Sequence, residues 1–274
     1  MASRTWFITG TSRGFGREWA VAALARGDRV VGTARNPSTL DDLTEQYPET
    51  FLALALDVTD REAAFATVKQ ANDHFGELDI VVNNAGYGHF GMIEEISEQD
   101  ARDQLETNVF GALWVTQAAL PYLRAQGRGH FLQVSSIGGI TAFRGVGIYH
   151  ASKWALEGFS QALALEVKDF GVHVTLIEPG GFATDWADSS ARRSEQLEPY
   201  KAVWEERQAQ RDAQRRGDPQ ASAAAVLKLV DADPPPLRCF LGTGPLAMAE
   251  ADYASRLETW REWQAVAELA QGES

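Results

Sequence analysis

Residues 6–16 read WFITGTSRGFG, and this stretch decides the fold. A short apolar run leads directly into three glycines, Gly10, Gly14 and Gly16, and then into an alanine-rich helical pattern. Glycine permits a tight turn close to a ligand, and the start of the following helix offers unpaired N–H groups and a partial positive charge. A Gly-x-x-x-Gly-x-Gly turn between a first strand and a first helix predicts a pyrophosphate-binding site in a dinucleotide fold.

The rest of the chain repeats this alternation of short apolar runs and helical patterns. Further strands are expected at residues 29–34, 51–56, 78–82, 130–134, 172–177 and 237–241, after the first at 6–9. Their apolar runs are continuous, which is typical of strands covered on both faces. Helices are expected at residues 14–26 and 61–75 and after Ser97. The alternation predicts an α/β fold: a Rossmann-type doubly wound parallel sheet of about seven strands.

The segment 185–220 differs from this pattern. It is polar and charged but contains Trp186, Tyr200 and Trp204. We interpret it as a helical insertion over the C-terminal edge of the sheet within a single Rossmann-type domain, residues 1–274. Its aromatic residues either close over the substrate as a lid or attach the insertion to the body. Helices are expected at 221–231 and, with several aromatics, at about 247–269.

Composition restricts the partners and the location. The chain has 38 acidic and 25 basic residues and a net charge of −13, which disfavours nucleic acid and anionic membranes. No apolar run approaches the 18 residues that a membrane span needs. The single cysteine, Cys239, and the absence of a signal-peptide pattern predict a cytoplasmic protein. Five histidines without ligand spacing indicate no metal site.

The second expected strand indicates which dinucleotide binds. NAD-binding folds place an acidic residue about 20 positions after the glycines, where it accepts hydrogen bonds from the ribose. Here the strand ends at Arg35 without an acid. Arg35 and Arg13, within the glycine turn, can both bind a 2′-phosphate, so the sequence favours NADP.

Tyr149 and Lys153 are four residues apart and therefore lie on one face of a helix. An ammonium about 5 Å away, at an effective dielectric of about 20, favours the phenolate by roughly 3 kcal/mol. That corresponds to about two pKa units below the ordinary tyrosine value of about 10. We therefore expect Tyr149 to have a lowered pKa and to act as a general acid and base.

With these motifs, residues 3–185 resemble the single-domain branch of the short-chain dehydrogenase/reductase family. Its cofactor turn matches Thr9 to Gly16, although Phe15 stands where a smaller aliphatic residue is usual. Ser136 lies 13 residues before Tyr149, the family's usual interval, and Ser135 is the alternative. The other segments that resemble family motifs are Asp57-Val58, Asn83-Asn84-Ala85-Gly86, Asn108 and Pro179-Gly180 with Thr184.

The resemblance implies a catalytic role for each member of a tetrad. Tyr149 would transfer the proton, Ser136 would hydrogen-bond the substrate oxygen, and Lys153 would bind the ribose and lower the pKa of Tyr149. Asn108 would organise a water relay to the lysine. The cofactor-binding residues that it implies are Gly10, Ser12, Arg13, Gly14, Phe15, Gly16, Arg35, Asp57, Val58, Asn84, Ala85, Gly86, Tyr149, Lys153, Pro179, Gly180 and Thr184.

Two sequence segments resemble those of the family branch that is related to 17β-hydroxysteroid dehydrogenases. They are residues 33–37 (TARNP) and 177–182 (IEPGGF). This implies a bulky or apolar carbonyl or alcohol as the small-molecule substrate. Relatives commonly form dimers or tetramers, and a bulky tail after Leu241 would obstruct one such interface. A homodimer is therefore the expected assembly.

The sequence disfavours a serine hydrolase and leaves two other functional classes open. A serine hydrolase would need a nucleophile elbow, and the chain contains no Gly-x-Ser-x-Gly. An NADP-binding sensor without turnover is an alternative, because a fold alone does not prove catalysis. A redox-neutral epimerase or dehydratase is another. His89 is either a loop histidine near the sheet edge or a border of the substrate pocket.

Overall fold

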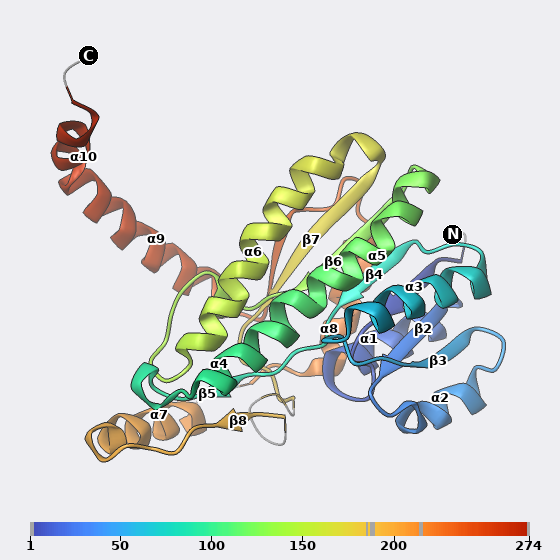
Figure 1. Ribbon diagram of the computed structural model, residues 1–274, viewed down its shortest axis with the longest axis horizontal. Helices are drawn as coiled ribbons and strands as arrows, with labels where there is room; N and C mark the ends of the chain where they lie inside the picture. The colour runs from blue at the N-terminus through green and yellow to red at the C-terminus, as the bar shows by residue number, and fades with distance from the viewer. Residues whose placement is uncertain (1–2, 185, 187–189, 214–215, 273–274) are drawn as a thin grey trace.

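A parallel sheet of seven strands forms the centre of the molecule, in the order β3-β2-β1-β4-β6-β7-β9 (Figure 1). The computed structural model describes residues 3–184, 186, 190–213 and 216–272. The predicted doubly wound sheet is confirmed, with β1 lying inside the sheet between β2 and β4. The strands are β1 (Thr5–Ile8), β2 (Arg29–Ala34), β3 (Phe51–Ala55), β4 (Ile80–Asn83), β6 (Gly129–Val134), β7 (Val172–Pro179) and β9 (Arg238–Leu241).

Helices cover both faces of the sheet. On one side Trp6 and Ile8 of β1 pack in a core with α1 and α8, and on the other Phe7 packs with α3, α5 and α6. Burial on both faces explains why the strands read as continuous apolar runs. The helices are α1 (Gly14–Ala25), α2 (Asp41–Gln46), α3 (Arg61–Phe75), α4 (Glu98–Leu105), α5 (Gly111–Gln126), α6 (Gly147–Val167) and α8 (Pro219–Val230).

The connection between α4 and α5 contains a feature that the sequence pattern did not predict. The expected start at Ser97 is confirmed, because its side chain accepts a hydrogen bond from the backbone N–H of Asp100. However, α4 passes directly into a π-helical turn, Glu106–Phe110, and then into α5. Such turns insert an extra residue into a helix and are frequent at functional sites.

The predicted insertion contains a strand as well as a helix. β8 (Arg192–Arg193) pairs in parallel with β5 (His89–Phe90), which follows β4, and α7 (Lys201–Ala213) comes next. The insertion lies beside α4 and β5, at the end of the molecule where the sheet strands finish (Figure 1).

The C-terminal segment forms an arm rather than one helix packed on the body. α9 (Pro245–Glu262) and α10 (Gln264–Gln271) are separated at Trp263 and extend away from the body (Figure 1). Pro245 and Ala249 are buried at its base, whereas Trp260 and Trp263 are 58% and 59% exposed.

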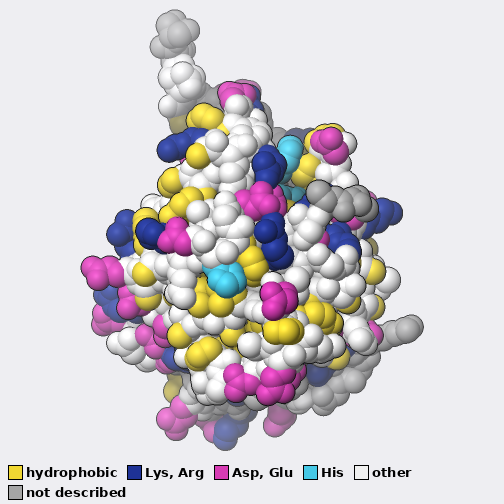
Figure 2. All heavy atoms as spheres, turned by 90° about the vertical axis from the view of Figure 1, so that its right-hand side faces the viewer, with side chains coloured by type: hydrophobic (Ala, Val, Ile, Leu, Met, Phe, Trp, Pro, Cys, Tyr) yellow, Lys and Arg dark blue, Asp and Glu magenta, His cyan; other side chains and the backbone are white. Residues whose placement is uncertain are grey.

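The surface carries charged side chains of both signs. On the face shown in Figure 2, acidic and basic side chains are interspersed with apolar ones. Within the described residues, no helix combines the length and apolar character that crossing a membrane requires.

Candidate active site

The glycine turn at the end of β1 is built so that backbone atoms approach closely. Gly10 and Gly14 have φ values of +69° and +61°, a region that favours glycine. A Cβ on Gly16 would lie 2.5 Å from Nδ2 of Asn84 and 2.6 Å from the carbonyl oxygen of Gly10. The Asn84 amide donates to the carbonyls of Thr9 (2.8 Å) and Gly10 (3.0 Å). Asn84 therefore holds the turn in shape and leaves no room for a side chain at position 16.

Thr9 ties this turn to the segment after β4. Its hydroxyl accepts hydrogen bonds from the backbone N–H groups of Asn84 (3.0 Å) and Ala85 (2.9 Å). Asn83 points into the sheet instead, where its amide donates to Thr116 Oγ1 and Gln133 Oε1. Two neighbouring asparagines thus have different roles: one supports the sheet and the other supports the turn.

Phe15, the departure from the usual family pattern, packs among aromatic rings. Its ring stacks on Trp19 at a centroid distance of 5.2 Å and meets Phe182 edge-on at 5.0 Å. Phe182 comes from the segment after β7, so the larger side chain joins that segment to the start of α1.

The residues expected to bind the rest of the dinucleotide surround the turn. Arg13 and Arg35 are exposed and Ser12 is half-buried. Asp57 is held by Thr59, whose N–H (3.0 Å) and hydroxyl (2.8 Å) both donate to its carboxylate.

Four further expected cofactor residues lie in tight surroundings. Val58 is buried against Gly111, and a Cβ on Gly86 would lie 3.0 Å from Oδ1 of Asn108. Gly180, after Pro179, donates its N–H to the carbonyl of Leu241 at 2.9 Å. A Cβ on Gly14 would lie 4.0 Å from Cβ of Thr184, so the glycine turn and the segment after β7 face each other.

The structure brings Tyr149, Lys153 and Ser136 together. Tyr149 and Lys153 lie on one face of α6, with the Lys153 ammonium 5.8 Å from the centre of the Tyr149 ring. The ammonium donates to the carbonyl of Val134 at 2.8 Å. Ser136, just after β6, hydrogen-bonds the Tyr149 hydroxyl. Ser135 lies instead beside Glu157, across the gap that a Cβ on Gly139 would fill.

The expected lowering of the Tyr149 pKa was wrong for this arrangement. Burial raises the pKa of Tyr149 to about 12, and only the hydrogen bond from Ser136 acts in the opposite direction. Burial also lowers the pKa of Lys153 to about 8, opposed by the charge of Glu157. The Trp186 ring lies 4.8 Å from the Tyr149 ring and helps to exclude water. Desolvation of the phenolate therefore dominates the pKa of Tyr149.

Asn108 lies in the π-helical turn and is buried. Its amide donates to the carbonyl of Tyr87 (3.0 Å) and to Oγ of Ser152 (3.1 Å), and its Oδ1 accepts from the N–H of Tyr87 (3.1 Å). These bonds join the π-helical turn to α6 one residue before Lys153. Ser152 and Tyr87 were missed from the sequence, because neither carries a motif of its own.

The aromatic residues of the insertion make two kinds of contact. Trp186 contacts the rings of Tyr149 and Phe90. Tyr200 donates its hydroxyl to Glu94 at 2.8 Å, and the Trp204 indole donates to Glu95. Trp186 therefore contacts the expected catalytic tyrosine, whereas Tyr200 and Trp204 attach the insertion to the body.

His89 is a buried residue of β5, not a solvated loop residue. Its Nε2 lies 2.8 Å from Oγ of Ser194, which follows β8. Burial lowers the pKa of His89. His89 therefore helps to hold the insertion in place.

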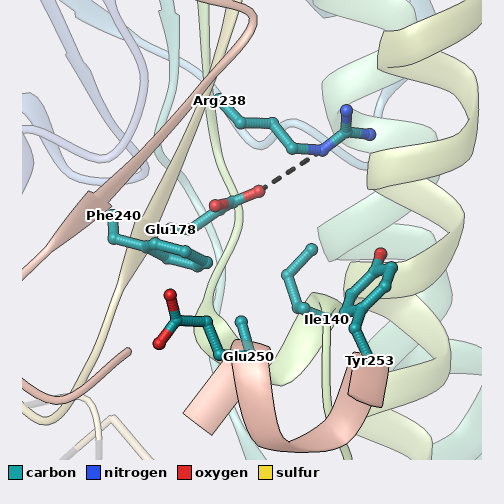
Figure 3. A pocket seen from close by; sticks show the side chains of 7 residues that line it. Ile140, Glu178, Arg238, Phe240, Glu250 and Tyr253 are labelled. Carbon is teal, nitrogen blue, oxygen red and sulfur yellow. Dashed lines mark ion pairs between the residues drawn. The ribbon is translucent and has the colours of Figure 1, made fainter. Parts of the chain in front are cut away.

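A second group of charges lies one turn beyond Lys153. Glu157 of α6 accepts from Arg238 Nε at 3.0 Å. Glu178 of β7 lies 3.5 Å from the same atom, as the dashed line in Figure 3 shows. Glu178 is 1% exposed and forms part of a pocket with Ile140, Phe240 and other residues. Burial, and then the charge of Glu157, raise the pKa of Glu178 to about 8. The pair was missed because each glutamate reads as an ordinary charge in its own element.

This raised pKa predicts a pH-dependent stability. A carboxyl group that holds its proton more firmly when folded stabilises the fold fully below the unfolded pKa of 4.5, and this contribution is lost as the pH rises through about 8. We expect Glu178→Gln to make the midpoint of thermal unfolding less sensitive to pH between 5 and 9. Glu250→Gln, at an exposed position on the same pocket, is the control. Equal pH sensitivity of wild type and Glu178→Gln would contradict the prediction.

Within the described residues, no group of three or more His, Cys, Asp or Glu side chains is arranged to hold a metal ion.

Comparisons with known proteins agree with this geometry. The family model described as short chain dehydrogenase matches residues 4–195. Oxidoreductase BOA17 of Botryotinia fuckeliana is 41% identical over 269 residues, which cover 95% of this chain and 97% of that protein. The crystal structure of a short-chain dehydrogenase from Streptomyces avermitilis is 38% identical and superposes with a TM-score of 0.92 over 98% of each chain.

A more distant structure is the alcohol dehydrogenase of Thermococcus sibiricus, complexed with 5-hydroxy-NADP. It is 25% identical, with a TM-score of 0.72, and the match covers 88% of this chain and 96% of that one. The family match spans most of the chain, and the order of the sheet strands fits it. This chain therefore belongs to the short-chain dehydrogenase/reductase family of oxidoreductases.

Proposed function

We propose that this protein is an NADP-dependent oxidoreductase that interconverts a carbonyl and an alcohol on a bulky or apolar small molecule. The observation that carries the proposal is the convergence of Ser136, Tyr149 and Lys153. The Thermococcus sibiricus relative, an alcohol dehydrogenase crystallised with an NADP derivative, supports the same reaction and cofactor class.

The residues at the end of β1 fit a dinucleotide. Gly16 leaves a cradle that a Cβ would fill, and the N-terminus of α1 directs N–H groups toward it. Gly10 and Gly14 let the backbone approach a pyrophosphate, and the exposed Arg13 and Arg35 would bind the 2′-phosphate. Asp57, Val58, Ala85 and Gly86 would border the adenosine half, and Pro179, Gly180 and Thr184 the nicotinamide half.

A bound nicotinamide would supply the hydride in reduction and accept it in oxidation, while the chain handles the proton. In reduction, the Tyr149 hydroxyl donates its proton to the carbonyl oxygen, and in oxidation it accepts the proton of the alcohol. Ser136 hydrogen-bonds the same oxygen and orients it. The Lys153 ammonium places a positive charge beside Tyr149 and stabilises the phenolate left after proton transfer. Trp186 shields the site from water.

The proposal also covers the oligomeric state of the protein, its cellular location and the role of the insertion. We propose a homodimer, and a cytoplasmic location on the basis of the single cysteine. The segment 185–220 acts as a substrate-covering insertion, since Trp186 lies over Tyr149. Residues 185, 187–189 and 214–215 of this segment lie outside the described residues.

The direct test is to follow oxidation of NADPH, and separately NADH, with a panel of ketones, aldehydes and quinones. Turnover with NADPH well above that with NADH would support the proposal. Tight binding of NADPH without turnover on the panel in either direction would favour a sensor instead.

Arg35→Ala is expected to raise the KM for NADPH by about 10- to 100-fold and to change the KM for NADH little. The reason is that a charge-assisted hydrogen bond contributes roughly 1.5–3 kcal/mol, and only NADPH carries the 2′-phosphate. Steady-state kinetics with both cofactors measures the effect. Arg102→Ala on the exposed face of α4 is the control. Equal increases for NADPH and NADH would show that another residue binds the phosphate.

A further inference from the structure

The C-terminal arm, formed by α9 and α10, concentrates the exposed apolar side chains of the protein. Among the described residues fifteen large apolar side chains are exposed, and eight of them belong to this arm, which is only about a tenth of the chain. They are Leu246, Met248, Tyr253, Leu257, Trp260, Trp263, Val266 and Leu269. Single apolar side chains on a surface are ordinary, whereas a group gathered on one element marks an interaction site.

The base of the arm is fixed to the body. Arg256 donates to the carbonyl of Ile140 at 3.1 Å, and its guanidinium lies 4.8 Å from the centre of the Trp154 ring on α6. Arg256 is also held by Asp252, one turn earlier in α9, at 2.7 Å. These contacts set the direction in which α9 leaves the body (Figure 1).

Beyond Arg256 the body gives the arm no support. Every residue from 257 to 272 is exposed, and among the described residues this part of the arm makes its side-chain hydrogen bonds within itself, as from Gln264 to Glu268. α10 has only eight residues, and an isolated helix of that length is marginal in water. The outer half of the arm therefore needs another surface to pack against.

The arm keeps its direction in a related chain. Since α9 and α10 make up about a tenth of this protein, the TM-score of 0.92 to the Streptomyces avermitilis dehydrogenase, over 98% of each chain, requires at least part of the arm to superpose as well. The two chains are 38% identical, so they differ at most positions. A shared direction indicates a built element and not a loose tail.

Charge and area indicate what covers the arm. Residues 245–271 contain five acidic and two basic side chains, whereas helices that lie on membranes are rich in Lys and Arg. A protein surface is therefore the better partner. At roughly 100 Å² each, the eight exposed apolar side chains offer about 800 Å², the share of one partner in a standard interface. A two-fold dimer uses the same patch on both subunits, so two arms would supply both shares.

We propose that the arm is a dimerisation element, buried against a second copy of this chain with Trp260 and Trp263 as its anchors. The arm of the second copy is buried in the same way against the first. Tryptophan suits this role, because it is the residue type most enriched among the side chains that dominate interface energies. The inference rests on the homodimer proposed above and adds the surface through which it forms. The tail would then build an interface, not only obstruct one.

Sedimentation velocity over a range of protein concentrations tests this interface. We expect wild type to be a dimer, and the dissociation constant to rise about 100-fold or more when Trp260→Ala and Trp263→Ala are combined. Alanine favours helix, so the arm itself should stay folded in this variant. Ile93→Ala, at an apolar position outside the arm that is 75% exposed, is the control and should dimerise as wild type does.

Tryptophan fluorescence shows whether the arm itself is buried. The emission of wild type should shift to shorter wavelength as the dimer forms, and the double variant should lack this shift. A dimer that persists unchanged in the double variant, or that forms without the shift, would overturn the arm interface and leave the homodimer standing. A wild type that is monomeric at every concentration would overturn both.

Two further measurements separate the other outcomes. A monomeric wild type that binds vesicles of phosphatidylcholine would assign the arm to a lipid surface and overturn the proposal. Dimerisation is measured without cofactor or substrate, so a dimer that depends on Trp260 and Trp263 supports the arm interface whatever the turnover. Absence of turnover on the carbonyl panel would count against the proposed reaction alone.

Discussion

Replacing Tyr149 by phenylalanine is expected to lower kcat by about 10²- to 10⁴-fold, the usual contribution of a general acid or base. The change removes only the hydroxyl that moves the proton. The ring would remain packed against Phe90, Val146 and Trp186, so the fold should be unaffected. The affinity for NADPH should stay nearly unchanged, because Lys153 and the glycine turn are intact.

Single-turnover kinetics and a fluorescence titration with NADPH measure the two effects separately. Tyr200→Phe is the matched control, since the Tyr200 hydroxyl bonds Glu94 at the surface and lies outside the site. Residual turnover close to wild type in Tyr149→Phe would show that another group transfers the proton. Loss of NADPH binding in the same variant would indicate structural damage instead.

The second large effect is expected at Gly16. In Gly16→Ala the new Cβ would meet the Asn84 amide and the Gly10 carbonyl at 2.5 and 2.6 Å, so the turn must open. Overpacking of this kind costs about 1–3 kcal/mol, and we expect that cost to appear as about 10- to 100-fold weaker binding of NADPH. The bonds from Asn84 to the carbonyls of Thr9 and Gly10 would be strained as well.

Isothermal titration calorimetry with NADPH measures the loss for Gly16→Ala. Gly158→Ala is the control, because it lies within α6 and a Cβ there meets no atom within 4 Å. That variant should bind NADPH as wild type does and unfold at the same or a higher temperature, since alanine favours helix. Normal NADPH affinity in Gly16→Ala would show that the turn is not the pyrophosphate site.

Most of the fold was predictable because its strands are short, apolar and separated by helical patterns. The expected strand 29–34 matches β2, and the others differ by one or two residues at their ends. The helix break at Trp263 was not predictable, because no glycine or proline marks it. The short strand β8 was also missed, because two arginines that pair with β5 carry no apolar pattern.

The position of the catalytic groups followed from local spacing, but their electrostatics did not. The spacing of four positions from Tyr149 to Lys153 places both on one face whatever surrounds the helix. Whether the pKa of Tyr149 is raised or lowered depends on how far its hydroxyl is shielded from water. Part of that shielding comes from Trp186, which belongs to a segment more than 30 residues away. For the same reason Glu157 and Glu178 could not be paired from the sequence: they meet only when α6 packs on β7.

The π-helical turn at Glu106–Phe110 also determines how the chain tolerates changes in length. Because the turn holds an extra residue, the side chains of α5 are rotated by about 100° relative to an uninterrupted continuation of α4. Removing one residue there would restore a single helical phase and turn Asn108 away from Ser152, with no change of residue type. A surface loop would absorb the same deletion. The spacing of this segment is thus under a constraint that comparison of residue identities alone does not reveal.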